Sequence, residues 1–185
     1  RMGSLVSREQ YQSVVDGIAA LSQQTSVLHD GKQHALVDAD PAVAACVGPT
    51  LLGTRDPDSA DVVHRTEVLG PVSTLMPYRN LEHALTLIRR GEGSLVASVY
   101  GADPATLAQA GTALADSHGR VHVISPAVAA THTGHGNVMP HSLHGGPGRA
   151  GGGEELGGLR ALGFYHRRSA VQADASVLDA IAAAP

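Results

Sequence analysis

The sequence predicts an α/β fold in which helices flank a sheet, and three observations support this class. Between residues 72 and 124, short apolar runs alternate with segments whose apolar residues recur at helical spacing. Caps and turn residues separate these segments. The length of 185 residues, 43% of them hydrophobic, is enough to bury one core of ordinary domain size.

The N-terminal part predicts one helix and two short strands. Ser7 and Gln10 have the spacing of a capping box ahead of apolar residues at helical spacing, which predicts a helix over about 8–22. The apolar pair at 27–28, followed by a turn, predicts a short strand. Residues 35–49 show no clear period, so we expect a loop there that leads into a second short strand.

The centre of the chain carries the α/β pattern itself. Asn80 can cap one helix, and Asp103 before Pro104 can cap another. In order, the sequence predicts a strand at 72–77, a helix at 80–90, a strand at 94–100, a helix at 104–118 and a strand at 120–124.

The C-terminal third has a different character. Residues 130–158 hold four His and many Gly without a hydrophobic period, which is typical of a functional or disordered loop. The segment 164–171 predicts a strand, and 176–184 predicts a short terminal helix.

Composition excludes several classes of protein. The chain has 13 Lys+Arg against 17 Asp+Glu, a net charge of −4, with few aromatic residues, so we expect no nucleic-acid partner. No apolar run approaches the ~20 residues of a membrane span. The single cysteine, Cys46, excludes an internal disulfide, and no neighbouring basic residue would activate it, so we expect a buried structural thiol.

Two histidine pairs, His132-x-x-His135 and His141-x-x-His144, have a spacing that could serve a metal. Neither pair lies on a predicted helix that would place both rings on one face, and no nearby Asp or Cys completes a ligand set. We therefore expect no metal site, and loop histidines that line a cleft instead.

The glycine-rich run 145–153 leaves two interpretations open: a cradle of backbone N–H groups for an anion, or a tight turn or linker. It does not match the phosphate-binding motif of nucleotide hydrolases, nor does it join a strand to a helix. Glu67, ahead of a Gly-Pro turn, would by default be a solvated carboxylate.

Four motifs in order and at matching spacing resemble the C-terminal part of the aldehyde dehydrogenase family. The family patterns are MGPLIS…Q, PTLL, EIFGPV and FGGxKxSGxGRELG. They resemble residues 2–10, 49–52, 67–72 and 144–157 respectively.

The resemblance implies oxidation of an aldehyde to an acid with NAD or NADP, with NADP favoured, by a cytoplasmic enzyme. The family's nucleophilic Cys and general-base Glu lie upstream of the first motif, as does its dinucleotide-binding region. The resemblance therefore implies a fragment without catalytic residues, inactive alone. Residues 1–160 would form most of the catalytic lobe. Residues 161–185 would supply a strand that joins a partner subunit in a homo-oligomer, and a terminal helix.

The resemblance also implies roles for single residues. Glu67 matches the family Glu that accepts hydrogen bonds from the nicotinamide ribose hydroxyls, and Leu69 stands where the family has Phe against the nicotinamide. His144 borders the aldehyde site. His135 and His141 belong to a loop, 131–143, that would line the substrate mouth.

Departures from the family motif indicate a subgroup. Gly148 and Glu154 stand where the last motif has Lys and Arg. In these departures the chain resembles the aldehyde dehydrogenase modules of bifunctional phenylacetate-degradation proteins. That implies a coenzyme A-linked semialdehyde from ring cleavage as substrate.

Two alternatives stay open from the sequence. One is a non-catalytic module that binds a metal or a partner through the His/Gly-rich loop 131–153. The other is a stand-alone remnant that serves only in oligomerisation.

Overall fold

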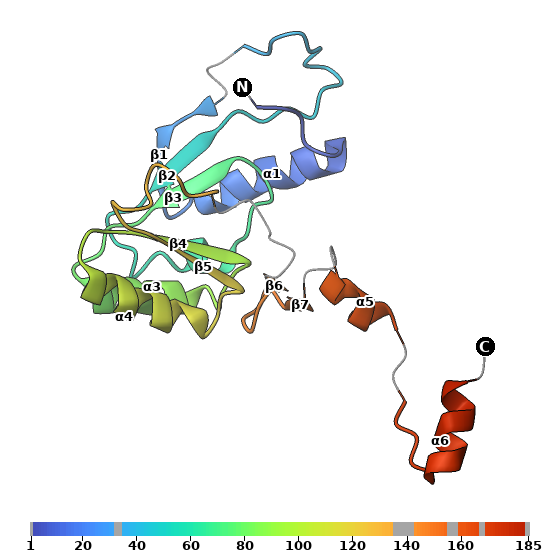
Figure 1. The fold of residues 1–185 in the computed structure, drawn as a ribbon. Coiled ribbons are helices and arrows are strands. Elements are labelled where there is room, and N and C mark those ends of the chain that lie inside the picture. The colour runs from blue at the N-terminus through green and yellow to red at the C-terminus, as the bar shows by residue number, and fades with distance from the viewer. Residues whose placement is uncertain (1, 32–34, 135–142, 155–158, 167–168, 184–185) are drawn as a thin grey trace.

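The computed structural model describes residues 2–31, 35–134, 143–154, 159–166 and 169–183 (Figure 1). The described part confirms the α/β class: helices pack beside short strands, and the two ends of the chain lie far apart. None of its helices is long and apolar enough to cross a membrane.

The N-terminal unit consists of helix α1 (Arg8–Leu21) and a three-stranded sheet. The Ser7 hydroxyl caps α1 by accepting a hydrogen bond from the backbone N–H of Gln10 at 3.1 Å, as the sequence predicts. The strands are β1 (Ser26–His29), β2 (Thr50–Gly53) and β3 (Val72–Leu75), in the order β1-β2-β3. Strand β1 is antiparallel to β2, and β2 is parallel to β3.

The second unit contains the parallel pair of strands β4 (Val96–Tyr100) and β5 (Arg120–Ile124). Helices α3 (Leu81–Arg90) and α4 (Pro104–Ala115) lie on the same side of this pair in Figure 1. Asn80 and Asp103 cap these helices, as the sequence predicts. The buried core here comes from aliphatic side chains: Leu85, Leu87, Leu107, Ala110, Leu114 and Ile124.

A short helix, α2 (Asp61–Arg65), lies between β2 and β3 along the chain and contacts both α1 and α3; the sequence did not predict it. The sequence also indicated one sheet, whereas the described strands form three separate sheets, with β3 and β4 in different ones. Strands that follow one another in an α/β chain are neighbours only in part of the cases, so alternation alone does not fix pairing.

The glycine-rich region contains a hairpin that the sequence did not predict. Strands β6 (Leu143–Gly145) and β7 (Gly152–Glu154) pair antiparallel, with His144 opposite Gly153. Glycines have no side chains to alternate between two faces, so no hydrophobic period marks these strands.

The predicted strand at 164–171 is wrong for this chain. Helix α5 (Leu159–Tyr165) occupies the start of that segment, and residues 169–171 form no strand. A strand forms only with a partner to hydrogen-bond, and no other described strand lies alongside. The terminal helix is confirmed as α6 (Ala175–Ala182), capped by Asp174. Figure 1 shows α5 beside the β6–β7 hairpin and α6 farther out, away from the sheets, and all of α6 is exposed.

Candidate functional site

A cavity of about 480 Å³ lies where α2, the turn after α3 and the glycine hairpin meet. We call it the Glu67 cavity. The residues that line it are His64, Thr66, Glu67, Gly91, Gly93, Ser94, Leu95, Arg149 and Ala150. Two segments that the sequence singled out, the one around Glu67 and the glycine-rich run, thus face one shared space although they lie far apart along the chain.

Helix α1 fixes the segment that carries Glu67. The Gln10 side-chain amide donates a hydrogen bond to the backbone carbonyl of Leu69 at 2.8 Å. Gly70 lies so close to α1 that a Cβ there would be 2.7 Å from Val14 Cγ2, and Val14 is 1% exposed. The backbone after Glu67 is therefore held against a buried helix face, while the Glu67 carboxylate itself stays exposed.

The glycine hairpin forms the opposite wall and is held through its backbone. Gly146 N–H donates to the Gly151 carbonyl at 2.6 Å, and Arg149 N–H donates to the Glu92 carbonyl at 2.8 Å. A Cβ at Gly148 would lie 2.3 Å from the Ser117 carbonyl oxygen and 2.6 Å from that of Glu92. Gly148 has no side chain, so the hairpin lies directly against the α3–β4 turn at Glu92 and the α4–β5 turn at Ser117.

The other residues that the sequence proposed for the site have different positions. Leu69 is 66% exposed and does not line the Glu67 cavity. His144 lies in β6 at the start of the glycine hairpin, exposed and outside the cavity lining. His135 and His141 lie outside the described residues. Within the part of the chain that is described, no group of three or more His, Cys, Asp or Glu could hold a metal ion.

Cys46 lies elsewhere. It is half-buried and lines a separate cavity of about 430 Å³ between α1 and the loop before β2. Among the described residues that line that cavity there is no His, Lys or Arg. The sequence predicts a buried thiol, whereas Cys46 is only half-buried.

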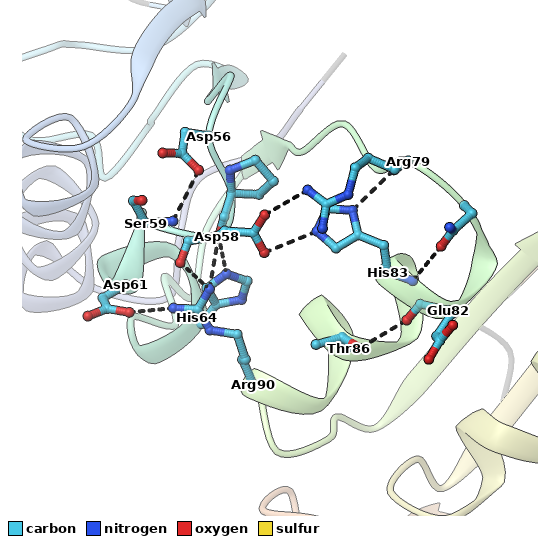
Figure 2. Close-up of polar contacts among 12 residues, drawn as sticks. Asp56, Asp58, Ser59, Asp61, His64, Arg79, Glu82, His83, Thr86 and Arg90 are labelled. Atoms are coloured by element: carbon cyan, nitrogen blue, oxygen red, sulfur yellow. Dashed lines mark hydrogen bonds and ion pairs between the residues drawn. The ribbon is translucent and has the colours of Figure 1, made fainter.

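A polar network behind the Glu67 cavity was not predicted from the sequence (Figure 2). The Asp58 carboxylate accepts hydrogen bonds from Arg79 at 3.0 Å and from the His83 ring at 3.1 Å. His83 Nδ1 accepts the backbone N–H of Arg79 at 3.1 Å, so the ring donates to Asp58 through Nε2. The hydrogen bond from His83, and next the one from Arg79, lower the pKa of Asp58 below its ordinary value of 3.8.

Arg90 belongs to the same network. Its guanidinium donates to the backbone carbonyls of Pro57 at 3.0 Å and Asp58 at 2.8 Å, and it forms an ion pair with Asp61. The His64 ring, 8% exposed, donates to the same Pro57 carbonyl at 3.0 Å. The bonds of this network link residues that are distant in sequence or lie in a loop, so no local sequence pattern predicts them. The only nearby residue that the sequence analysis named is Asn80, the predicted cap of α3.

Over residues 1–171 the chain matches the aldehyde dehydrogenase family. The chain belongs to this family. It spans only part of the length of the relatives it matches, so it corresponds to a portion of an aldehyde dehydrogenase.

Two curated relatives show how far the similarity extends. The chain is 44% identical over 181 residues to "Protein MaoC" of Klebsiella aerogenes, covering 97% of the chain and 52% of that protein. It is 50% identical over 148 residues to the 3,4-dehydroadipyl-CoA semialdehyde dehydrogenase of Aromatoleum evansii, covering 80% of the chain and 29% of that protein.

Solved aldehyde dehydrogenases share the fold. An aldehyde dehydrogenase from Bartonella henselae superposes with a TM-score of 0.62 at 22% identity, over 83% of the chain and 29% of that protein. Aldehyde dehydrogenase C of Pseudomonas syringae, solved as a mutant with NAD⁺ and octanal, gives 0.61 at 21% identity, over 80% and 27%. These likenesses establish the fold of this aldehyde dehydrogenase chain.

Proposed function

We propose that the chain is the C-terminal part of an NAD(P)-dependent aldehyde dehydrogenase that oxidises a coenzyme A-linked semialdehyde of aromatic-acid catabolism to the carboxylic acid. The observation that carries the proposal is the Glu67 cavity, which is lined both by Glu67, an exposed residue, and by Arg149 and Ala150 of the glycine hairpin. The substrate class is supported by the similarity to the Aromatoleum evansii relative, a 3,4-dehydroadipyl-CoA semialdehyde dehydrogenase.

The Glu67 carboxylate has the chemistry that a ribose needs. Within the described residues no group donates a hydrogen bond to it, so its acceptor sites are available to a ligand. One carboxylate can accept from two vicinal hydroxyls at once, which fixes a sugar ring in position and orientation. Glu67 would in this way hold the nicotinamide ribose of NAD(P), and the nicotinamide, when bound, would accept the hydride.

In this proposal the residues of this chain therefore position the cofactor and the substrate, and they take no part in the bond changes. In this proposal the thiol nucleophile and the general base come from the upstream part of the protein, and Cys46 takes no part. Leu69 would contact the nicotinamide end, while His144, with His135 and His141, would line the path of the aldehyde. The chain alone would be inactive, because the reacting groups are supplied by other residues.

The finer features of the proposal rest on the family resemblance. They are a preference for NADP over NAD, a homo-oligomer formed through the C-terminal segment, and a cytoplasmic location. The exposed apolar side chains of α6, Val177, Leu178 and Ile181, are compatible with burial in such an assembly. The boundary between a catalytic lobe at 1–160 and an oligomerisation segment at 161–185 is part of the same proposal.

The test is a Glu67→Gln substitution in the whole protein that contains this chain, measured with NADP and a semialdehyde thioester. We expect the hydride-transfer rate to fall by roughly tenfold to a hundredfold, because the neutral amide holds the ribose less well. Pre-steady-state formation of NADPH, followed by its absorbance, separates this step from acyl release.

Glu82→Gln is the matched control, because Glu82 is an exposed carboxylate on α3 that lies outside the cavity. Its hydride-transfer rate should equal that of the unmodified protein. An unchanged rate in Glu67→Gln would remove Glu67 from the reaction and the proposal with it.

A further inference from the structure

Arg90 occupies the junction between the parts that build the Glu67 cavity. It is the last residue of α3, and the residues directly after it, from Gly91 to Leu95, form one wall of the cavity. Its side chain points back to the loop before α2, the helix that leads into Glu67 (Figure 2). Through its backbone and its side chain, Arg90 thus connects two walls.

The contacts that the Arg90 side chain makes are of a strong type. The Arg90 side chain is only 28% exposed, and its guanidinium makes three contacts: with the carbonyls of Pro57 and Asp58, and with the Asp61 carboxylate. Hydrogen bonds from a charged donor are about twice as strong as neutral ones, and the planar fork fixes direction as well as distance.

Arg90 supports helix α2 together with two other contacts: the Gln24 side-chain oxygen accepts the Val62 backbone N–H at 2.9 Å, and Arg65 pairs with Asp61 at 2.7 Å. It has five residues, and its N-cap residue, Ala60, makes no side-chain capping bond. A helix of this length is not stable by itself. Asp61, its first residue, is the one that pairs with Arg90, and His64 on the next turn shares the Pro57 carbonyl with it.

The third wall is connected through the turn that follows Arg90. The Glu92 carbonyl accepts the Arg149 backbone N–H, and Glu92 itself adopts a left-handed conformation with φ of 61°. A non-glycine residue in that conformation is held there by its surroundings. The glycine hairpin is therefore hydrogen-bonded to the turn that follows Arg90, and the Arg90 side chain holds the beginning of that turn.

We propose that Arg90 is a positioning residue for dinucleotide binding: its contacts with Pro57, Asp58 and Asp61 hold Glu67 at a set distance from the glycine hairpin. This rests on the proposed function of Glu67 as the ribose ligand. Arg90 itself does not line the cavity, so its effect on the ligand is exerted through the two walls it joins.

The experiment compares Arg90→Ala with Arg89→Ala in the whole protein. Arg89 is the preceding residue of the same helix, exposed and without a recorded partner among the described residues, so both changes remove one positive charge at one helix end. The Kd for NADPH, measured by its fluorescence on binding, should rise about tenfold in Arg90→Ala. In Arg89→Ala it should change by less than about twofold.

Further readouts separate positioning from a general loss of structure. The KM for the semialdehyde should change by less than about twofold in Arg90→Ala, and Arg90→Lys should restore part of the NADPH affinity. In the present chain alone, hydrogen exchange should become faster at residues 61–67 and 91–93 of Arg90→Ala while α4 is unchanged.

The outcomes distinguish the two proposals. If Glu67→Gln weakens NADPH binding and Arg90→Ala binds like Arg89→Ala, the assignment of Arg90 is wrong and the proposed function stands. If Glu67→Gln leaves NADPH binding unchanged, the proposed function is wrong, and the assignment of Arg90 that rests on it is wrong as well. If Arg90→Ala does not fold, Arg90→Lys and Asp61→Asn carry the test, and unchanged NADPH affinity in both overturns the assignment.

Discussion

The wall of the Glu67 cavity built by α2 is held by charged side chains, whereas the wall built by the glycine hairpin is held by backbone atoms. Arg90 and Asp61 exemplify the first kind, and Gly148, seated on the carbonyls of Ser117 and Glu92, exemplifies the second. The α2 wall should respond to charge and pH, because its contacts are ionic. The hairpin wall should respond to added volume and be indifferent to charge.

The largest expected effect is on the hairpin wall. Gly148→Ala would place a Cβ 2.3 Å from a backbone oxygen, and backbone cannot yield as a flexible side chain does. We expect a loss of about 2–4 kcal/mol in the free energy of unfolding of the chain, measured by urea denaturation.

Gly153→Ala, in the same hairpin, is the control because a Cβ there meets nothing within 4 Å. Its stability should change by less than about 0.5 kcal/mol. Equal losses in the two variants would mean that the close seating of Gly148 is not what holds the hairpin.

A smaller effect is expected where α1 holds the Glu67 segment. Gln10→Ala removes the hydrogen bond from the side-chain amide to the Leu69 carbonyl, and also the 3.3 Å bond that the side-chain oxygen accepts from the Val6 backbone N–H. The substitution should lower stability by about 1 kcal/mol. Hydrogen exchange near Leu69 should become faster. Gln12→Ala, which removes only an exposed bond to Asp16 on the same helix, should cost about 0.3 kcal/mol.

The smallest expected effect is on the stability of the chain at acidic pH. Because the pKa of Asp58 in the folded chain lies below its ordinary value of 3.8, the folded state binds this proton less readily than the unfolded state. The resulting stability is present above pH 3.8 and is lost as the pH falls through the lowered pKa. Asp58→Asn should therefore flatten the fall of the urea midpoint below about pH 4.

Glu82→Gln serves as the comparison for that series, because it removes an exposed carboxylate on α3 that accepts no side-chain bond among the described residues. A midpoint curve for Asp58→Asn that coincides with that of the unmodified chain would show that the His83 and Arg79 bonds do not contribute to the acid response.

Helices were predictable from the sequence because their signals are local. Ser7, Asn80 and Asp103 each lie next to the segment that they cap, and all three accept the expected backbone N–H. The shared position of Glu67 and the glycine-rich run was predictable only through the family motifs, since nothing in either segment alone indicates the other.

The parts that were missed depend on contacts distant in sequence. Arg90 and Asp61 are ordinary charged residues until the fold brings them together, and no pattern in the chain marks the pair. The glycine hairpin lacks the alternation that marks a strand. The segment 164–171 has a strand-like composition, but a strand also needs a neighbour, and no strand of the described residues lies beside it.

The most direct measurement is a structure of the whole protein with NADP bound. We expect a Glu67 carboxylate oxygen within about 3.2 Å of the nicotinamide ribose hydroxyls, with the glycine hairpin on the opposite side of the ring. A ribose bound more than about 5 Å from Glu67, with its hydroxyls held by other residues, would contradict it.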